Sequence, residues 1–237
     1  MDREEVQKEK SAVPDLKESI EIGREDEEGL PNHWPDRFDS EGADFRMIMQ
    51  DFFLQCKELH KLVMSAIGTG MGLGEAYFDD FVRVGDNTLR LLHYPPVKRE
   101  VFAKNKDQVR AGAHSDYGSI TLLFQDMRGG LQVQSRDGEW LDVTPIDGTV
   151  VVNAGDLLMR WSNDTIRSTK HRVVEPPLEE ADMEEYPARY SVAYFGNPDF
   201  HKMIEVLPGT WENDKGGKKY ESINSGDYPV QRLSVTY

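Results

Sequence analysis

The sequence predicts a mainly β fold with flanking α-helices, in which a jelly-roll core is backed by a long amphipathic helix. Apolar side chains recur on one side of a helical repeat between residues 45 and 67. After Thr88 the pattern changes to many short β-rich runs that are separated by turn signals. Closely spaced short strands are typical of antiparallel sandwiches and barrels, and the helix should pack on the flat surface of such a fold.

The N-terminal stretch, residues 1–30, is expected to be an acidic peripheral arm that is partly disordered. It holds eleven acidic and five basic side chains with little periodic apolar content, so it cannot build a core. Within it, the run "DLKESIEIG" suits a short ordered edge. Residues 31–237 are predicted to form a single domain.

Residues 45–81 are expected to be mainly helical. The apolar stripe consists of Phe45, Ile48, Met49, Phe52, Cys56, Leu59, Val63 and Ile67. The glycines of "GTGMGLG" end the helical pattern before a short helical piece around "EAYFDDF". This glycine run does not read as a phosphate loop, because its spacing fails and no Gly-Lys-Ser/Thr follows. We expect His60 on the surface of the helix.

Residues 88–200 are predicted to form the jelly-roll core, and residues 201–237 a C-terminal segment. The β-rich runs are "TLRLLHYP", "SITLLFQD", "GLQVQS", "EWLDV", "TVVVNAGD", "LLMRW", "TKHRVVE" and "ARYSVAYF". Asp137-Gly138 suits a tight hairpin between two of them. The acidic loop from Glu175 to Glu185 is expected to be a solvated insertion.

The charge balance restricts the class of partner. The 237 residues include 43 acidic and 28 basic side chains, which gives a formal net charge of −15. Nucleic acids and anionic membranes bind mainly through clustered Lys and Arg, so we expect neither as a partner and expect a small molecule instead. One cysteine, Cys56, allows no internal disulfide, and we find neither a signal peptide nor an apolar run of about 20 residues. A cytoplasmic protein is the expectation.

Two residues in the run "AGAHSDYGS" have the spacing of metal ligands. In an extended strand, residues i and i+2 point to the same face, so His114 and Asp116 would project together from the sheet. His171 is a candidate third ligand, because a barrel can bring its strand alongside. Two histidines and one carboxylate form the facial triad of non-heme Fe(II) oxygenases, which leaves positions open for substrate and dioxygen. The alternative is that His114 and Asp116 are only a hydrogen-bonded pair at a strand end.

The run "ARYSVAYF" suggests a site for an acid. Arg189 and Ser191 alternate on one face with Ala193 and Phe195. A guanidinium donates two parallel hydrogen bonds to a carboxylate, and a serine hydroxyl adds a third. The alternative is an arginine paired with one of the many surface acids. An arginine that faces an apolar interior without a partner would, however, be costly.

Taken together, these segments resemble the 2-oxoglutarate- and Fe(II)-dependent oxygenases of the isopenicillin N synthase-like group, in particular its fungal-type members. The similar segments are "LRLLHYPP", "GAHSDYG", "ITLLFQD", "GGLQV", "GEW", "VVNAGDLLMRWSND", "STKHRVV", "ARYSVAYFGNPD" and "RLSVTY". The resemblance extends from about Asn32 to Tyr237. It implies a double-stranded β-helix whose iron is held by His114, Asp116 and His171.

The resemblance also implies a cosubstrate and a reaction. Arg189 and Ser191 would bind the distal carboxylate of 2-oxoglutarate, with help from Tyr94, and Phe195 is a candidate wall of the substrate pocket. Fe(II), 2-oxoglutarate and dioxygen would then oxidise a small organic metabolite by hydroxylation, desaturation or ring closure. Decarboxylation of 2-oxoglutarate to succinate would accompany this reaction.

Two alternatives stay open, and the second of them follows from one departure from the family pattern. Members of the group usually have a longer region before the "NHWP" segment, with a strand and helices that pack on the barrel. The alternatives are an Fe(II) oxidase that uses no 2-oxoglutarate, and an inactive metal-binding or interaction module. Barrel surface left uncovered by a short N-terminal region also predicts self-association into a homo-oligomer.

Overall fold

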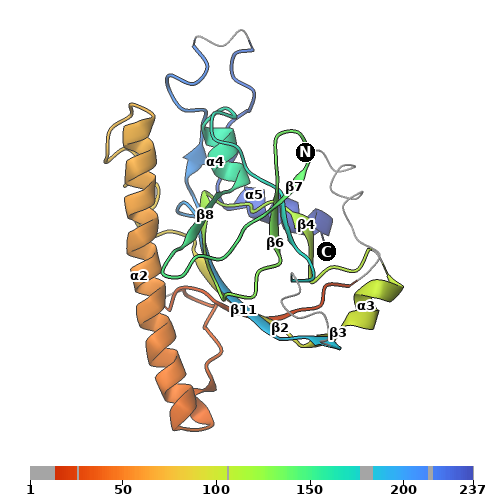
Figure 1. Cartoon of the computed structure of the whole chain (residues 1–237). Coiled ribbons are helices and arrows are strands. Elements are labelled where there is room, and N and C mark those ends of the chain that lie inside the picture. The colour runs from red at the N-terminus through yellow and green to blue at the C-terminus, as the bar shows by residue number, and fades with distance from the viewer. Residues whose placement is uncertain (1–13, 26, 106, 177–183, 213–215, 237) are drawn as a thin grey trace.

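A computed structural model describes residues 14–25, 27–105, 107–176, 184–212 and 216–236. Two antiparallel sheets face each other across an open interior, and helices flank them (Figure 1). This architecture confirms the predicted mainly β jelly roll with flanking helices. Parts of the predicted acidic arm and acidic loop, residues 1–13, 26 and 177–183, lie outside the described residues.

The larger sheet has five strands and forms one wall of the interior. Its order is β1 (Glu18–Ile22), β2 (Thr88–Tyr94), β11 (Arg189–Gly196), β5 (Ile120–Gln125) and β8 (Val151–Ala154). The edge strand β1 falls in the run that suited an ordered edge, and it pairs with β2 over its full length. Along β2 and β11, alternate side chains point into the interior, so one face of each strand lines it.

The smaller sheet forms the opposite wall. Its order is β4 (Ala111–His114), β9 (His171–Val173), β6 (Leu131–Gln134) and β7 (Trp140–Asp142). The hairpin between β6 and β7 turns where Asp137-Gly138 predicted it, with Gly138 at a φ of 86°. Side chains with a Cβ rarely adopt such a φ, whereas glycine does so without strain.

The remaining elements are short and lie around the two sheets. They are η1 (Pro35–Arg37), α3 (Arg99–Lys104), α4 (Asp156–Trp161), α5 (Asp227–Thr236), the pair β3 (Val97–Lys98) and β10 (Glu185–Tyr186), and the pair β12 (Met203–Ile204) and β13 (Ile223–Asn224). Among the described residues, no helix combines the length and apolarity that crossing a membrane would require.

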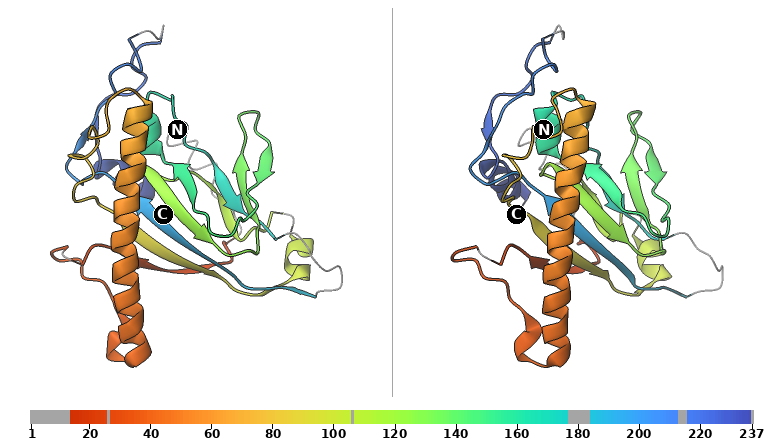
Figure 2. Two further views of the ribbon diagram at one scale, coloured as in Figure 1. Left: turned by 60° about the vertical axis from the view of Figure 1, so that its left-hand side comes forward. Right: turned by 90° about the vertical axis from the view of Figure 1, so that its left-hand side faces the viewer.

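The long amphipathic helix is α2 (Ser40–Gly70), and it runs across the outer face of the larger sheet (Figure 2). It begins earlier than the apolar stripe because Asp39 caps it, accepting a hydrogen bond from the Gly42 amide at 2.7 Å. The expectation that His60 lies on the helix surface is wrong. His60 follows Cys56 by one turn and precedes Met64 by one turn, so it lies on the buried face of the helix.

The chain beyond α2 differs from the expected short helix. Residues 75–81 form turns, in which the Phe81 amide donates to the carbonyl of Phe78 three residues earlier. Both phenylalanine rings pack edge-on against Trp161, each with a centroid distance of 4.9 Å. Tertiary packing of these aromatic side chains therefore replaces helical geometry in this segment.

The hydrophobic core is divided between two places. The larger cluster joins α2 to the outer face of the larger sheet and includes Phe53, Leu122 and Tyr194. A smaller cluster, which includes Tyr94 and Leu131, lies between the sheets. Most of the core side chains lie between α2 and the larger sheet. The space between the two sheets is therefore only partly filled, and it contains a cavity.

Candidate metal and cosubstrate site

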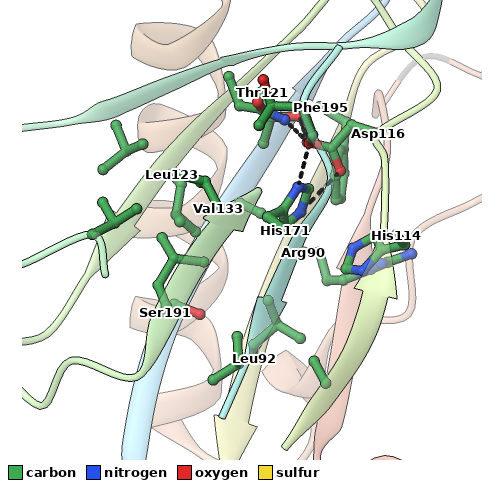
Figure 3. Close-up of a pocket in the computed structure, with 18 of the residues that line it drawn as sticks. Arg90, Leu92, His114, Asp116, Thr121, Leu123, Val133, His171, Ser191 and Phe195 are labelled. Carbon is green, nitrogen blue, oxygen red and sulfur yellow. Dashed lines mark hydrogen bonds and ion pairs between the residues drawn. The ribbon is translucent and has the colours of Figure 1, made fainter. Parts of the chain in front are cut away.

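The cavity between the two sheets has a volume of about 360 Å³ and is lined from both walls (Figure 3). Four alternate residues of β11 line it, as their spacing predicted: Arg189, Ser191, Ala193 and Phe195. Tyr94 lines it from β2, while its neighbour His93 lies on the opposite face of the sheet. The candidate acid site and the candidate metal ligands therefore share one cavity.

His114, Asp116 and His171 converge at one end of this cavity. Their ligand atoms all lie within 4.8 Å of one another, which is the spacing that a shared metal ion needs. His114 ends β4 and pairs in register with His171 at the start of β9. The predicted strand geometry is wrong for Asp116, because β4 ends at His114 and Asp116 lies in the irregular segment that follows.

Hydrogen bonds fix which atoms of the two histidines face the metal position. Nδ1 of His114 lies 2.8 Å from the Gly112 carbonyl, and Nδ1 of His171 lies 3.2 Å from the Thr169 carbonyl. Since a carbonyl oxygen only accepts, both Nδ1 atoms carry the proton and both Nε2 atoms keep a lone pair. Although part of the His114 ring is exposed, desolvation by the surrounding protein and then the neighbouring His171 lower its pKa to about 4, so the ring is neutral at pH 7.

The Asp116 carboxylate is oriented in the same way. Its Oδ2 accepts hydrogen bonds from Thr121 Oγ1 and Asn153 Nδ2, each at 2.7 Å. Its Oδ1 is directed toward His171 and lies 3.7 Å from Nε2 of that ring. Two imidazole lone pairs and one carboxylate oxygen on the same side of an open cavity fit the donor set of a non-heme Fe(II) centre.

Arg189 is almost completely enclosed, with 1% of its surface exposed. It donates hydrogen bonds to the Gly129 carbonyl at 3.0 Å, to Ser191 Oγ at 3.2 Å and to Gln125 Oε1 at 3.1 Å. Its guanidinium carbon lies 5.0 Å from the centroid of the Tyr94 ring. Burial lowers the pKa of Arg189 from its ordinary value, yet a guanidinium stays charged at pH 7.

The surroundings of Arg189 decide against pairing with a surface acid. Within the described part of the chain, no carboxylate forms an ion pair with this guanidinium, whose partners are neutral oxygens. A buried cation whose hydrogen-bond partners are all neutral is stabilised strongly when an anion arrives. The base of the cavity therefore fits a carboxylate, with the metal position further along the same cavity.

Sequence reasoning missed the residues that orient these groups. Thr121 and Asn153 pair in register on β5 and β8 and hold Asp116, while Gln125 and Gly129 hold Arg189. A signal for Thr121 was present, because it is a polar residue in the apolar run "ITLLF". Arg90, which pairs in register with Ala193 on β11, also lines the cavity and was not singled out.

Comparisons with known proteins agree with this site. The sequence profile of the 2OG-Fe(II) oxygenase superfamily matches residues 85–198. The chain is 40% identical over 230 residues to a proline hydroxylase, buaE, of Petromyces alliaceus, which covers 95% of this chain and 70% of that protein. It is 37% identical over 230 residues to the 2-oxoglutarate-Fe(II) type oxidoreductase ppzD of Metarhizium rileyi, which covers 95% of this chain and 62% of that protein.

Solved structures that resemble this chain point to the same class of protein. A full-length Neurospora crassa protein crystallised with alpha-KG and thymine is 61% identical, with a TM-score of 0.90, and the match covers all of this chain and 70% of that one. The same protein crystallised with alpha-KG and 5-formyluracil is 62% identical, with a TM-score of 0.89, over 95% of this chain and 71% of that one.

The chain belongs to the 2OG-Fe(II) oxygenase superfamily and has its double-stranded β-helix core. It is a 2-oxoglutarate-dependent Fe(II) dioxygenase, an oxidoreductase that uses dioxygen. The predicted family, fold and class of enzyme are confirmed.

Proposed function

We propose that this enzyme oxidises the C5 methyl group of a small pyrimidine base of the thymine kind. The observation that supports this most is the 61–62% identity to the Neurospora crassa protein that binds thymine and 5-formyluracil. 5-Formyluracil is thymine with its methyl carbon oxidised to an aldehyde. A protein that binds both molecules accepts the C5 carbon before and after its oxidation, which supports a reaction at this carbon.

The proposed metal ligands are His114, Asp116 and His171. Bound there, Fe(II) would supply the activation of dioxygen that is coupled to decarboxylation of 2-oxoglutarate. The chain's own contribution is orientation, because backbone carbonyls fix both imidazoles and Thr121 with Asn153 fixes the carboxylate. The apolar side chains that line the cavity would limit the water around the reacting atoms once the cosubstrate and substrate fill it.

Arg189, Ser191 and Tyr94 are proposed to hold the distal carboxylate of 2-oxoglutarate. Arg189 presents the only charge of the three, and Ser191 adds a hydroxyl that already lies 3.2 Å from the guanidinium. Tyr94 is 3% exposed and lies over the guanidinium, which keeps the charged group away from solvent. A carboxylate in this place would neutralise a buried cation.

The other end of the cavity fits a flat, uncharged ring. The Arg90 guanidinium carbon lies 5.0 Å from the centroid of Phe195, so a planar group can lie against either surface. Glu21 accepts a hydrogen bond from Arg90 Nε at 2.8 Å, so the Arg90 charge already has an anionic partner. A neutral pyrimidine with carbonyl acceptors therefore suits this place better than a carboxylic acid substrate.

The first test is turnover by the purified chain with Fe(II), 2-oxoglutarate and thymine. We expect succinate and a hydroxymethyl product in equal amounts by mass spectrometry, and neither after His114→Ala. Arg189→Met should raise the KM for 2-oxoglutarate roughly ten- to a hundred-fold, the equivalent of a lost charged hydrogen bond. Arg167→Met, which removes an exposed arginine, is the matched control and should change nothing.

Other outcomes would select other functions. Turnover of free proline but not thymine would point to the reaction named for the Petromyces alliaceus relative. Oxygen consumption that ignores 2-oxoglutarate would indicate an oxidase. Metal binding with no decarboxylation on any substrate would indicate an inactive module.

We also propose that the enzyme acts in the cytoplasm and that it self-associates. The net charge of −15 supports a partner other than nucleic acid or an anionic membrane. Fluorescence microscopy of the tagged chain and size-exclusion chromatography with light scattering test the two statements separately. A strict monomer would remove the second.

A further inference from the structure

The C-terminal helix α5 makes polar contacts with a buried carboxylate near the metal site. Asp156, the first residue of α4, is 4% exposed. Its Oδ2 accepts hydrogen bonds from the Tyr228 hydroxyl at 3.1 Å and from Ser115 Oγ at 3.2 Å, and it lies 3.6 Å from Arg232 Nη2. Tyr228 and Arg232 are one turn apart on α5, so the helix presents both to the same oxygen.

Asp156 is connected in turn to the segment that carries a metal ligand. Ser115 stands between His114 and Asp116, and the Asp156 amide donates to the Asp116 carbonyl at 2.8 Å. The Arg232 guanidinium lies 5.1 Å from the centroid of the Tyr117 ring. Contacts from α4 and α5 thus reach three consecutive residues, 115 to 117.

This segment needs such support because it has no regular strand structure. β4 ends at His114 and β5 begins at Ile120, so Asp116 lies between two strands. A ligand on a connecting segment is placed by the contacts of that segment. Asp156, Tyr228 and Arg232 are not among the residues that line the cavity, and their direct contacts reach the site through this segment.

The charge of Asp156 ties the docking of α5 to the order of this segment. A buried carboxylate is stable only when cations and hydrogen-bond donors compensate it, and α5 supplies a cation and a hydroxyl. Burial and the neighbouring Asp156 raise the pKa of Tyr228, so its hydroxyl keeps the proton that it donates. The Arg160 guanidinium covers the Tyr228 ring, with 5.5 Å to the centroid.

We propose that α5 is a positioning element of the iron site: Tyr228 and Arg232 hold Asp156, and Asp156 fixes the 115–117 segment so that Asp116 meets His114 and His171. This inference rests on the proposed iron ligands. The three residues touch neither substrate nor metal and are positioning residues. Loss of their contacts should loosen the metal ligand without unfolding the barrel.

The test measures Co(II), a spectroscopic substitute for Fe(II), bound to the full chain and to two α5 variants. Tyr228→Phe removes one oxygen, and Arg232→Gln removes the charge. We expect each to weaken Co(II) binding roughly tenfold, the lower end of the effect of groups that orient metal ligands, and to change the Co(II) visible spectrum. Arg232→Lys, which keeps the charge, should recover part of the affinity.

A matched control lies in the same part of the chain. The Tyr220 hydroxyl donates to Asp164 Oδ1 at 2.6 Å, and Arg160 covers the Tyr220 ring as it covers Tyr228. Asp164 makes no described contact with residues 115–117, so Tyr220→Phe should leave the Co(II) affinity and spectrum unchanged. Urea unfolding of all variants separates lost affinity from lost stability.

The outcomes distinguish this inference from the proposed function. If Tyr228→Phe and Arg232→Gln bind Co(II) like Tyr220→Phe, the positioning role is wrong. Co(II) binding that weakens as expected, in a chain that does not oxidise thymine, supports the role of α5 and rejects only the proposed substrate. Co(II) binding that survives His114→Ala would overturn both the ligand assignment and the inference.

Discussion

Asp116 divides its two oxygens between the protein and the metal position. Oδ2 receives hydrogen bonds from Thr121 and Asn153, which leaves Oδ1 toward His171. A carboxylate held in this way has lost its rotational freedom before a metal arrives. The affinity of the site should therefore depend on donors that never touch the metal.

Replacement of Thr121 by valine tests this dependence at the scale of one atom. Thr121→Val keeps the shape of the side chain and removes the hydroxyl that donates to Asp116 at 2.7 Å. We expect roughly tenfold weaker Co(II) binding by isothermal titration calorimetry, with the far-ultraviolet circular dichroism unchanged. Thr149→Val is the control, because the exposed Thr149 hydroxyl donates only to the Ile146 carbonyl. Equal affinity in both variants would mean that Thr121 does not orient the ligand.

The sequence was sufficient to predict which residues meet in the candidate site, and insufficient to show how they are oriented. Alternation along a strand correctly grouped Arg189, Ser191 and Phe195 on the cavity face. The same rule failed for Asp116, because β4 ends two residues earlier, at His114. The end of a strand depends on hydrogen bonds to other parts of the fold, which the pattern of one segment does not show. Pairs such as Thr121 with Asn153 form only through strand register, which the periodicity of a single segment does not contain.

Among the elements, the contact between α2 and the larger sheet contains a buried titratable group. Nε2 of His60 lies 3.0 Å from Ser119 Oγ, whose own proton goes to the Gly196 carbonyl at 2.7 Å. The Ser119 oxygen must therefore accept, and His60 is protonated on Nε2. Its Nδ1 is buried and has no partner in the described structure, so a second proton would be unfavourable.

This arrangement predicts a specific dependence of stability on pH. Burial lowers the pKa of His60 to about 4, below the usual value of about 6.5 in an unfolded chain. Between these two values the unfolded state binds more protons, so stability is complete above pH 6.5 and falls as the pH drops toward 4. The fall due to His60 should be about 3 kcal/mol, measured as the free energy of unfolding in urea.

Glutamine at position 60 isolates this contribution. His60→Gln keeps an N–H donor near Ser119 and cannot titrate, so its unfolding free energy should fall less between pH 6.5 and 4 than that of the parent. His201→Gln, which replaces an exposed histidine, should follow the parent curve. Identical slopes for His60→Gln and the parent would show that His60 does not determine this dependence.

Close contacts between elements explain two glycines of the motifs that pointed to the family. A Cβ atom on Gly155 would lie 2.2 Å from the Gly118 carbonyl oxygen, and one on Gly118 would lie 2.8 Å from the Gly196 carbonyl oxygen. These contacts bring the end of β8 and the segment after Asp116 together. The motif could be recognised in the sequence, but the contact that requires glycine is visible only in the fold.

At the scale of the whole molecule, the site connects the two sheets. His114 and His171 belong to the smaller sheet, while Thr121 and Asn153, which hold Asp116, belong to the larger one. Arg189 extends the site along the larger sheet. A ligand that binds this site only when both sheets are in place must stabilise the complete barrel against unfolding.

Thermal unfolding should therefore report the order of binding. Co(II) at about one hundred times its Kd should raise the free energy of unfolding by about 2.7 kcal/mol. For a domain of this size, that gain corresponds to an increase in Tm of roughly 5–10 °C. 2-Oxoglutarate should add a further increase only when Co(II) is present, because one of its ends would bind the metal and the other Arg189. In Arg189→Met the increase from Co(II) should persist and the increase from 2-oxoglutarate should disappear, whereas Arg167→Met should keep both. A shift from 2-oxoglutarate of the same size without metal, or in His171→Ala, would contradict this prediction, because it would show that the metal end of the site contributes nothing to holding the cosubstrate.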